Sequence, residues 1–247
     1  MSVSGRDRFT AWVKAAPVVG PSARAVVRRV RVKRFPGSAE YWERRYAAGG
    51  DSGDGSAGVL AEFKATTIDD LVAREGVQTV IEFGCGDGRQ LALAHYPKYL
   101  GLDVSPSAIE RCGRLFSDDA SKSFCLYEPG SWIDRAGWHR ADLVLSLDVL
   151  YHLVEEQVWV RHLEHVFDAS TRFVVIYAAD EDAPRTGAHV LVRSFTQWVS
   201  EHRPEWRLVQ QVDNPFWVSA NNADGIDITS SSMANFFIFE RRREPAT

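Results

Sequence analysis

The chain has 247 residues, of which 45% are hydrophobic and 25% are charged, and its formal net charge is -4. A chain of this length and composition can bury one large core, so we expect a single domain with appended segments. The mildly acidic balance argues against a protein whose whole surface attracts nucleic acid or anionic lipid.

The three cysteines, Cys85, Cys112 and Cys125, are far apart and form no CxxC pair of the kind that binds zinc. We therefore predict no metal site, and the odd number of cysteines favours a reducing cytoplasm. No apolar run is long enough to cross a bilayer, and the first residues carry charges throughout. The expectation is a soluble cytoplasmic protein without a transmembrane segment.

The N-terminal residues differ in composition from the rest of the chain. Between Arg24 and Arg34 there are six basic residues, no acidic ones, and interleaved valines. Such a segment can contact a membrane surface, a partner or a polyanion, or it can be a solvated arm that packs its valines on the domain. We interpret residues 1–40 as a basic arm and residues 41–247 as the domain.

Residues 41–58 begin with aromatic and basic side chains and continue into a glycine-dense stretch. Five glycines fall between Gly49 and Gly58, and so many glycines disfavour a regular helix or strand. We predict a glycine-rich lid over 41–58. A helix is expected from Val59 to Arg74, with Gly76 as its stop signal and an apolar face formed by Leu60, Phe63, Ile68 and Leu71.

Alternating apolar runs and helical stretches follow, which is typical of a parallel sheet covered on both faces. The long polar segment between the last two runs predicts a hairpin-like ending. The fold class is therefore α/β, a doubly wound seven-stranded Rossmann-like sheet with an antiparallel edge strand. The predicted strands are Thr79 to Phe83, Tyr99 to Val104, Ser123 to Tyr127, Asp142 to Leu147, Arg172 to Tyr177, Trp206 to Val212 and Asn235 to Glu240.

The most informative segment is VIEFGCGDG, residues 80–88, in which Glu82 precedes glycines at positions 84, 86 and 88. The glycines allow a tight turn and close approach of a ligand at the carboxyl end of a strand, and a helix is expected to begin near Arg89. A dinucleotide-binding fingerprint would read GxGxxG, whereas this register is GxGxG.

Asp103 ends the next predicted strand, 21 residues after Glu82. An acid at this place can accept hydrogen bonds from both hydroxyls of a ribose, or it can merely cap a turn. Ser105 followed by Pro106 reads as a helix N-cap and first helical residue.

These segments resemble the first two motifs of the class I S-adenosylmethionine-dependent methyltransferase superfamily, and the resemblance extends over roughly residues 41 to 240. It implies that S-adenosylmethionine is the cofactor, with its methionine portion at the glycines, its ribose at Asp103, and its adenine near Tyr127, Glu128, Gly130 and Ser131. The implied cofactor-binding residues are Tyr41, Trp42, Glu82, Gly84, Cys85, Gly86, Gly88, Asp103, Val104, Ser105, Ser131, Leu147 and Asp148.

The segment ADLVLSLDVLYHL, residues 141–153, resembles the fourth strand of that superfamily and the start of the following helix. The resemblance places Asp148, Tyr151 and His152 beside the sulfonium and the methyl acceptor. The wider sequence, with the strings YWERRY, GGDSGDGSAG, LAEFKA, SLDVLYHLVEE and SSSMANFFIFE, resembles a bacterial methyltransferase subgroup. Members of this subgroup often occur among genes for the assembly of glycans or other specialised metabolites.

A hydroxyl acceptor must lose its proton during methyl transfer, so a general base is expected. His152 is the first candidate because the pKa of histidine lies near neutrality, with Tyr151 and His189 as alternatives. His152 could equally be a packing residue. Asp148 together with Asp180 and Asp182 could instead hold Mg²⁺.

The sequence thus predicts methyl transfer to a hydroxyl or amine of a small metabolite or glycan. The alternative is a macromolecular acceptor, protein or nucleic acid, recruited through the basic arm. A non-catalytic binding protein and a dehydrogenase are further alternatives. No nucleic-acid-binding module is recognisable, so no specific nucleic-acid partner is expected, and the sequence predicts no particular oligomeric state.

Overall fold

The computed structural model describes residues 35–183, 187–218 and 231–242. The basic segment from Arg24 to Arg34 lies outside these residues. Contacts between residues group Pro36–Thr247 into one compact unit. Residues 36–40, which we assigned to the arm from the sequence, are therefore the first residues of this unit.

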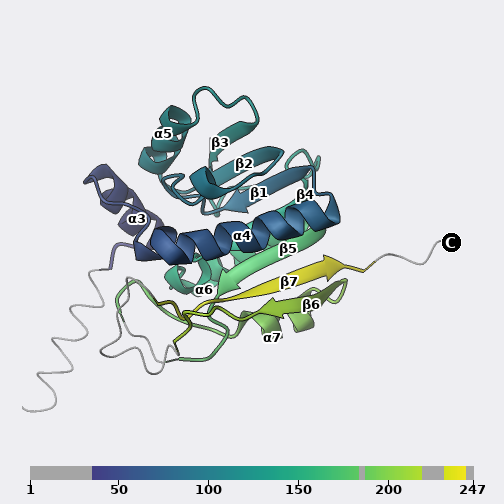
Figure 1. Ribbon diagram of the computed structural model, residues 1–247. Helices are drawn as coiled ribbons and strands as arrows, with labels where there is room; N and C mark the ends of the chain where they lie inside the picture. Colours follow the sequence, from purple (N-terminus) through teal and green to yellow (C-terminus); the bar gives the residue numbers. More distant parts are fainter. Residues whose placement is uncertain (1–34, 184–186, 219–230, 243–247) are drawn as a thin grey trace, which may run out of the picture. The chain divides into compact units, whose positions relative to one another are not determined.

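Seven strands form one sheet in the order β3-β2-β1-β4-β5-β7-β6. The first five in the chain are parallel, and β7 pairs antiparallel with both β5 and β6. The predicted α/β fold with an antiparallel pairing at one edge is confirmed (Figure 1). The strands are β1 Thr79–Phe83, β2 Lys98–Asp103, β3 Lys122–Leu126, β4 Ala141–Leu147, β5 Ser170–Ala178, β6 Trp206–Val212 and β7 Asn235–Arg241.

Helices cover both faces of the sheet. The α-helices are α3 Ser38–Ala47, α4 Gly58–Glu75, α5 Pro106–Leu115, α6 Glu156–Asp168 and α7 Phe195–His202. Three short 3-10 turns are η1 Asp54–Ser56, η2 Leu91–Leu93 and η3 Leu150–His152.

Each face of the sheet has its own apolar core. Helices α4 and α5 pack on one face, where Ile68, Leu71 and Cys112 are fully or almost fully buried, and α4 runs across the sheet in Figure 1. Helices α6 and α7 pack on the other face through Leu163 and Phe195. Burial from both sides explains the near-continuous apolar runs of β1, β4 and β5.

The helix predicted from Val59 to Arg74 is confirmed as α4, and it ends where predicted. Gly76 is its C-cap and adopts the left-handed conformation with φ of 62°, which a residue without a Cβ adopts at low cost.

One helix was not predicted, and one expectation about local structure was wrong. Tyr41 to Ala47, the first part of the range predicted as a lid, belongs to α3, because Ser38–Ala47 contains no glycine and is rich in alanine, glutamate and arginine. The helix expected near Arg89 is only the turn η2. Three glycines with positive φ occupy the start of this connection and Pro97 stands at its end, so little chain remains for a helix.

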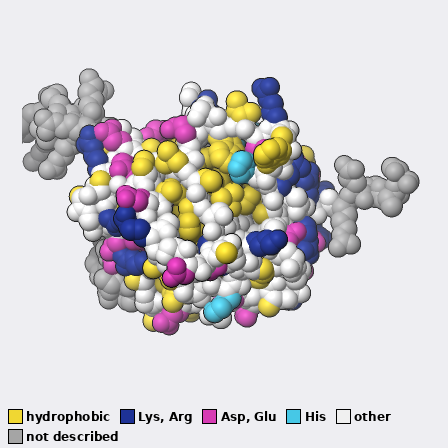
Figure 2. All heavy atoms as spheres, turned by 90° about the horizontal axis from the view of Figure 1, so that it is seen from above, with side chains coloured by type: hydrophobic (Ala, Val, Ile, Leu, Met, Phe, Trp, Pro, Cys, Tyr) yellow, Lys and Arg dark blue, Asp and Glu magenta, His cyan; other side chains and the backbone are white. Residues whose placement is uncertain are grey.

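Strand β3 forms one edge of the sheet, and large apolar side chains are exposed around it. Figure 2 looks onto this side and shows apolar side chains gathered near its middle. Separately from the picture, the large apolar side chains that are exposed on β3, at the end of α5 and between β3 and β4 are Leu115, Leu126, Ile133 and Trp138. Among the described helices, none is long and apolar enough to cross a membrane.

Candidate functional site

A cavity of about 630 Å³ lies at the carboxyl ends of β1, β2 and β4. This volume is within the usual range of pockets for cofactors and small ligands. Its walls bring together most of the predicted site residues: Tyr41, Trp42, Glu82, Gly84, Cys85, Gly86, Asp103, Val104, Leu147, Asp148, Tyr151, His152 and His189. Tyr127, Glu128 and Gly130, predicted near an adenine, also line it.

Three residues of the predicted cofactor set do not line this cavity. A Cβ at Gly88 would lie 2.9 Å from Phe116, so the glycine there permits close packing. Ser105 is buried at the start of α5, where its Oγ accepts a hydrogen bond of 3.1 Å from Ala108 N, as its predicted N-cap role requires. Ser131 is exposed after β3. The structure gives these residues packing, capping and surface positions instead.

Asp103 ends β2 and is buried in the cavity wall. Its Oδ2 accepts a hydrogen bond from Gly86 N and its Oδ1 accepts one from Ser105 N, each at 2.9 Å. Burial raises the pKa of Asp103 to about 6, and the backbone hydrogen bonds oppose this rise. A carboxylate has about four lone-pair sites, so Asp103 can still accept a hydrogen bond from a ligand.

Glu82, at the end of β1, is buried beside the glycine segment. It accepts a hydrogen bond of 2.6 Å from the hydroxyl of Tyr99 on β2. Burial raises the pKa of Glu82 to about 7, while the Tyr99 hydrogen bond and the nearby Lys64 ammonium oppose this rise. The glycine segment itself is anchored to β2, because Gly84 N donates to Leu102 O at 2.7 Å.

Asp148 follows β4 in a left-handed conformation, with φ of 59°, and is the one described non-glycine residue with positive φ. Such strained backbone concentrates at functional sites, where the surrounding structure must hold it in place. Here Asp148 N donates to Tyr177 O at 2.9 Å. Its Oδ1 accepts from the Tyr151 hydroxyl at 2.6 Å, and its Oδ2 pairs with Lys64 Nζ at 2.5 Å.

Lys64 is a site residue that the sequence reasoning missed. Its side chain is 1% exposed, and it lines the cavity from α4. A signal was available, because position 64 lies four residues after Leu60 and four before Ile68, on the apolar stripe of the helix. A lysine on a buried stripe must find a partner, although the pattern could not name Asp148.

His152 is held by contacts that define its tautomer. Its Nδ1 lies 3.1 Å from the backbone oxygen of His189, and because a carbonyl can only accept, Nδ1 carries the proton and Nε2 keeps the lone pair. Burial lowers the pKa of His152 to about 4. The imidazole is therefore neutral near pH 7, with Nε2 able to accept a proton.

Aromatic rings surround His152 in the cavity wall. Its ring stacks on that of His189 with centroids 5.6 Å apart and meets Trp42 of α3 edge-on at 4.9 Å. Tyr41 stacks on His189 at 4.6 Å. Tyr151 donates its hydroxyl to Asp148, and burial raises its pKa well above the usual range. Tyr151 therefore suits a donor better than a base.

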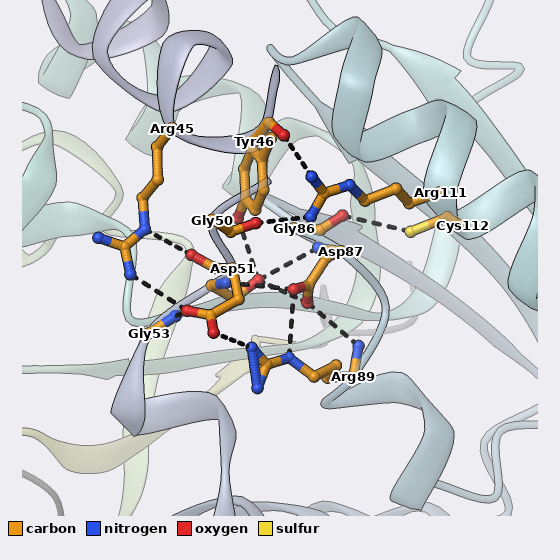
Figure 3. A network of polar contacts seen from close by, with 11 residues as sticks. Arg45, Tyr46, Gly50, Asp51, Gly53, Gly86, Asp87, Arg89, Arg111 and Cys112 are labelled. Carbon is orange, nitrogen blue, oxygen red and sulfur yellow. Dashed lines mark hydrogen bonds and ion pairs between the residues drawn. The ribbon is translucent and has the colours of Figure 1, made fainter. Parts of the chain in front are cut away.

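The segment after α3 is held against the glycines of the β1–β2 connection (Figure 3). Ser52 Oγ donates to Asp87 Oδ1 at 2.7 Å and accepts from Asp87 N at 3.1 Å. A Cβ at Gly86 would lie 2.4 Å from Ser52 Oγ and 3.0 Å from the Tyr46 hydroxyl. Only glycine at position 86 allows this close approach.

Three arginines surround this contact in Figure 3. Arg89 pairs with Asp87 at 3.2 Å and with Asp51 at 2.5 Å, and Arg45 also binds Asp51, at 3.1 Å. Arg111 of α5 donates to Gly50 O at 2.6 Å and to the backbone oxygen of Tyr46. The glycine-rich segment is thus fixed by side chains from the elements around it.

The acids considered for a magnesium site have other partners. Asp180 accepts hydrogen bonds from Thr196 N at 3.0 Å and from Ser194 Oγ at 3.2 Å, at the start of α7. Asp182 accepts from Ser194 N at 3.2 Å. In the part of the chain that the structure describes, these acids and Asp148 do not form a group that could hold a metal ion.

No protein-family model matches the sequence, and no curated protein matches it. Solved structures with a similar fold include several methyltransferases. The N-methyltransferase NodS from Bradyrhizobium japonicum WM9, in complex with S-adenosyl-L-homocysteine, has a TM-score of 0.62 and 18% identity, covering 84% of this chain and 100% of that chain. The chain has a class I methyltransferase fold.

Two further structures illustrate how varied such proteins are. Magnesium protoporphyrin IX methyltransferase from Synechocystis PCC 6803, with bound S-adenosylhomocysteine, has a TM-score of 0.56 and 13% identity over 87% of this chain and 99% of that chain. A small RNA methyltransferase has a TM-score of 0.55 and 14% identity over 75% of this chain and 26% of that chain. Likeness at these identities shows the fold, and the substrate must be argued from the site.

Proposed function

We propose that this protein is an S-adenosylmethionine-dependent methyltransferase that acts on a hydroxyl, or an amine, of a small metabolite or glycan. One observation carries the proposal: Gly84, Gly86, Asp103 and Asp148, identified from separate segments of the sequence, line a single cavity on a methyltransferase fold. Similar structures contain S-adenosylhomocysteine or S-adenosylmethionine.

The residues of the cavity suit this cofactor. Asp103 offers free lone pairs to ribose hydroxyls. Gln90 is buried in the same wall, its Nε2 donates to Ala61 O at 3.0 Å, and its Oε1 has no hydrogen-bond partner among the described residues. An unsatisfied buried acceptor calls for a donor, such as the cofactor's ammonium group. When bound, the cofactor supplies a methyl group activated by the positive charge on sulfur.

The acceptor is assigned to the part of the cavity lined by Trp42, Tyr151, His152 and His189. Helix α3 contributes Tyr41 and Trp42 to this wall, which favours a small acceptor and keeps water away from the transfer. His152 would take the proton of an acceptor hydroxyl at Nε2 as that oxygen accepts the methyl group that the bound cofactor would supply. The His189 carbonyl keeps the imidazole in the required tautomer.

Titration calorimetry tests the cofactor, and labelled methyl transfer tests the reaction. S-adenosylmethionine and S-adenosylhomocysteine should bind with one site per chain, and NAD should not bind. Protein incubated with methyl-labelled cofactor and a panel of sugars, hydroxylated metabolites and amines should label at least one of them. Saturable binding of NAD without binding of S-adenosylhomocysteine would replace the proposal with a dehydrogenase.

A further inference from the structure

Lys64 and Asp148 form a buried ion pair in the wall of the cavity. The lysine is 1% exposed, the aspartate side chain is 16% exposed, and Nζ lies 2.5 Å from Oδ2. Strands β1 and β4 are neighbours, with Glu82 in register with Leu145. Glu82 and Asp148 therefore stand at the same end of the sheet, and Lys64 acts electrostatically on both.

The stability of the fold does not account for this pair. Position 64 lies on the apolar face of α4, where a leucine or methionine would pack against the same neighbours. Removing two charges from water costs several kcal/mol, which their mutual attraction offsets only in part. The lysine Nζ also lies 5.4 Å from the centre of the Tyr177 ring. A role in the cavity explains its presence better than a role in packing.

Lys64 is the ammonium group that acts on the two carboxyl groups of Glu82 and Asp148 in this wall. Asp103 stands at the end of the neighbouring strand β2. Two further cations, Arg45 and Arg161, line other parts of the cavity, and Arg45 is held by Asp51. Without Lys64, the Asp148 carboxylate would attract a positively charged ligand more strongly, because charges interact strongly where water is excluded.

Methyl transfer removes the positive charge of the cofactor, since a sulfonium becomes a neutral thioether. A cavity that binds the sulfonium too tightly stabilises the reactant more than the transition state, in which this charge is already dispersing. Building on the proposed function, we propose that Lys64 is a specificity-determining residue that limits the preference of the cavity for the charged cofactor over its neutral product. Lys64 does so by compensating the charge of Asp148.

The test compares the dissociation constants of S-adenosylmethionine and S-adenosylhomocysteine by titration calorimetry. The informative quantity is the dissociation constant of S-adenosylhomocysteine divided by that of S-adenosylmethionine. In Lys64→Met this ratio should rise at least fivefold. In Asp148→Asn, which leaves the lysine uncompensated, the ratio should fall at least fivefold. Lys64→Arg should restore most of the wild-type ratio.

Lys98→Met is the matched control, because Lys98 is exposed at the start of β2, and it should leave the ratio unchanged. The changes should persist between about 50 and 500 mM salt, because buried charges are screened less than surface charges. Circular dichroism establishes that each variant is folded. Should Lys64→Met not fold, Lys64→Gln, which also removes the ammonium charge, takes its place in the comparison.

The possible failures are distinguishable. If the wild type binds neither compound, the proposed function is wrong. If the wild type binds both and folded Asp148→Asn and Lys64→Met keep the wild-type ratio, the ion pair has only a structural role and this inference is overturned.

Discussion

The carboxylate of Asp103 is held on both oxygens by backbone amides of the glycine segment and of the start of α5. It therefore has a fixed orientation in the cavity wall before any ligand arrives. This preorganisation lowers the entropic cost of binding a ribose.

Asp103→Ala should weaken S-adenosylmethionine binding by about 1.5 to 3 kcal/mol, the usual range for lost hydrogen bonds to a charged group. Titration calorimetry measures the change. Asp103→Asn keeps one acceptor oxygen and should lose less. Unchanged affinity in a folded Asp103→Ala variant would remove Asp103 from the cofactor site.

His152→Ala should lower turnover of a hydroxyl acceptor by about 100-fold or more, the scale for loss of a general base, and leave cofactor binding nearly intact. Turnover is measured on the acceptor found in the labelling screen. If the variant keeps near wild-type turnover, His152 is structural and the proton goes to another group or to water.

The pH dependence of the same reaction follows from the burial of His152. Its pKa is lowered to about 4, so the imidazole stays neutral well below pH 6. Only the neutral ring can accept a proton. If His152 is the base, the rate should therefore show no loss from this group between pH 8 and 6. It should decrease as the pH falls through about 4, where the ring becomes protonated. A loss of rate centred near pH 6.5 that disappears in His152→Ala would contradict this assignment.

At the scale of elements, the segment between α3 and α4 joins the glycines of the β1–β2 connection through Ser52 and Asp87. Its role as a lid stays a prediction. A ligand that contacts Gly86 should also contact this segment, because the Tyr46 hydroxyl and Ser52 lie directly over that glycine.

Hydrogen exchange of the backbone amides in residues 49–56 should slow when S-adenosylhomocysteine is added, because closure over the ligand protects them. Mass spectrometry of peptides measures this, with strand β6 at the far edge of the sheet as the internal control. Ser52→Ala should exchange faster without ligand. Equal exchange in 49–56 with and without ligand would rule out the lid.

The stability of the whole molecule is linked to pH through the carboxyl groups of its cavity. Burial raises the pKa of Glu82 from about 4.5 in the unfolded chain to about 7. Between these values the unfolded state has released the proton and the folded state still binds it, so Glu82 makes the fold less stable as the pH rises through this window.

Glu82→Gln removes this contribution. The difference in unfolding free energy between the variant and wild type should be about 2 to 3 kcal/mol larger, in favour of the variant, at pH 8 than at pH 5. One pKa unit corresponds to about 1.4 kcal/mol. Urea unfolding at the two pH values measures the difference. Glu62→Gln, at an exposed position of α4, is the matched control. A difference between Glu82→Gln and wild type that does not vary with pH would show that Glu82 is ionised throughout.

Much of the fold could be predicted from the sequence because strands and helices leave local patterns. Strands β1 and β6 lie where their apolar runs predict, and Gly76 ends α4 as expected. The glycine segment and Asp103 identified the cavity, because glycines and an acid at strand ends have few other reasons to occur together. Helix α3 was missed, since the neighbouring glycines dominated the interpretation of its sequence.

The sequence by itself determined the order of the elements, the doubly wound sheet and the strand ends from which the cavity is built, because backbone preferences and burial are encoded over a few residues. Only the tertiary structure decided which side chains meet. It pairs Lys64 with Asp148 across 84 positions of the chain, and it fixes the tautomer of His152 through a carbonyl 37 positions away. It also leaves Gly88, Ser105 and Ser131 out of the cavity wall. Such contacts depend on how distant segments pack, which no local pattern records.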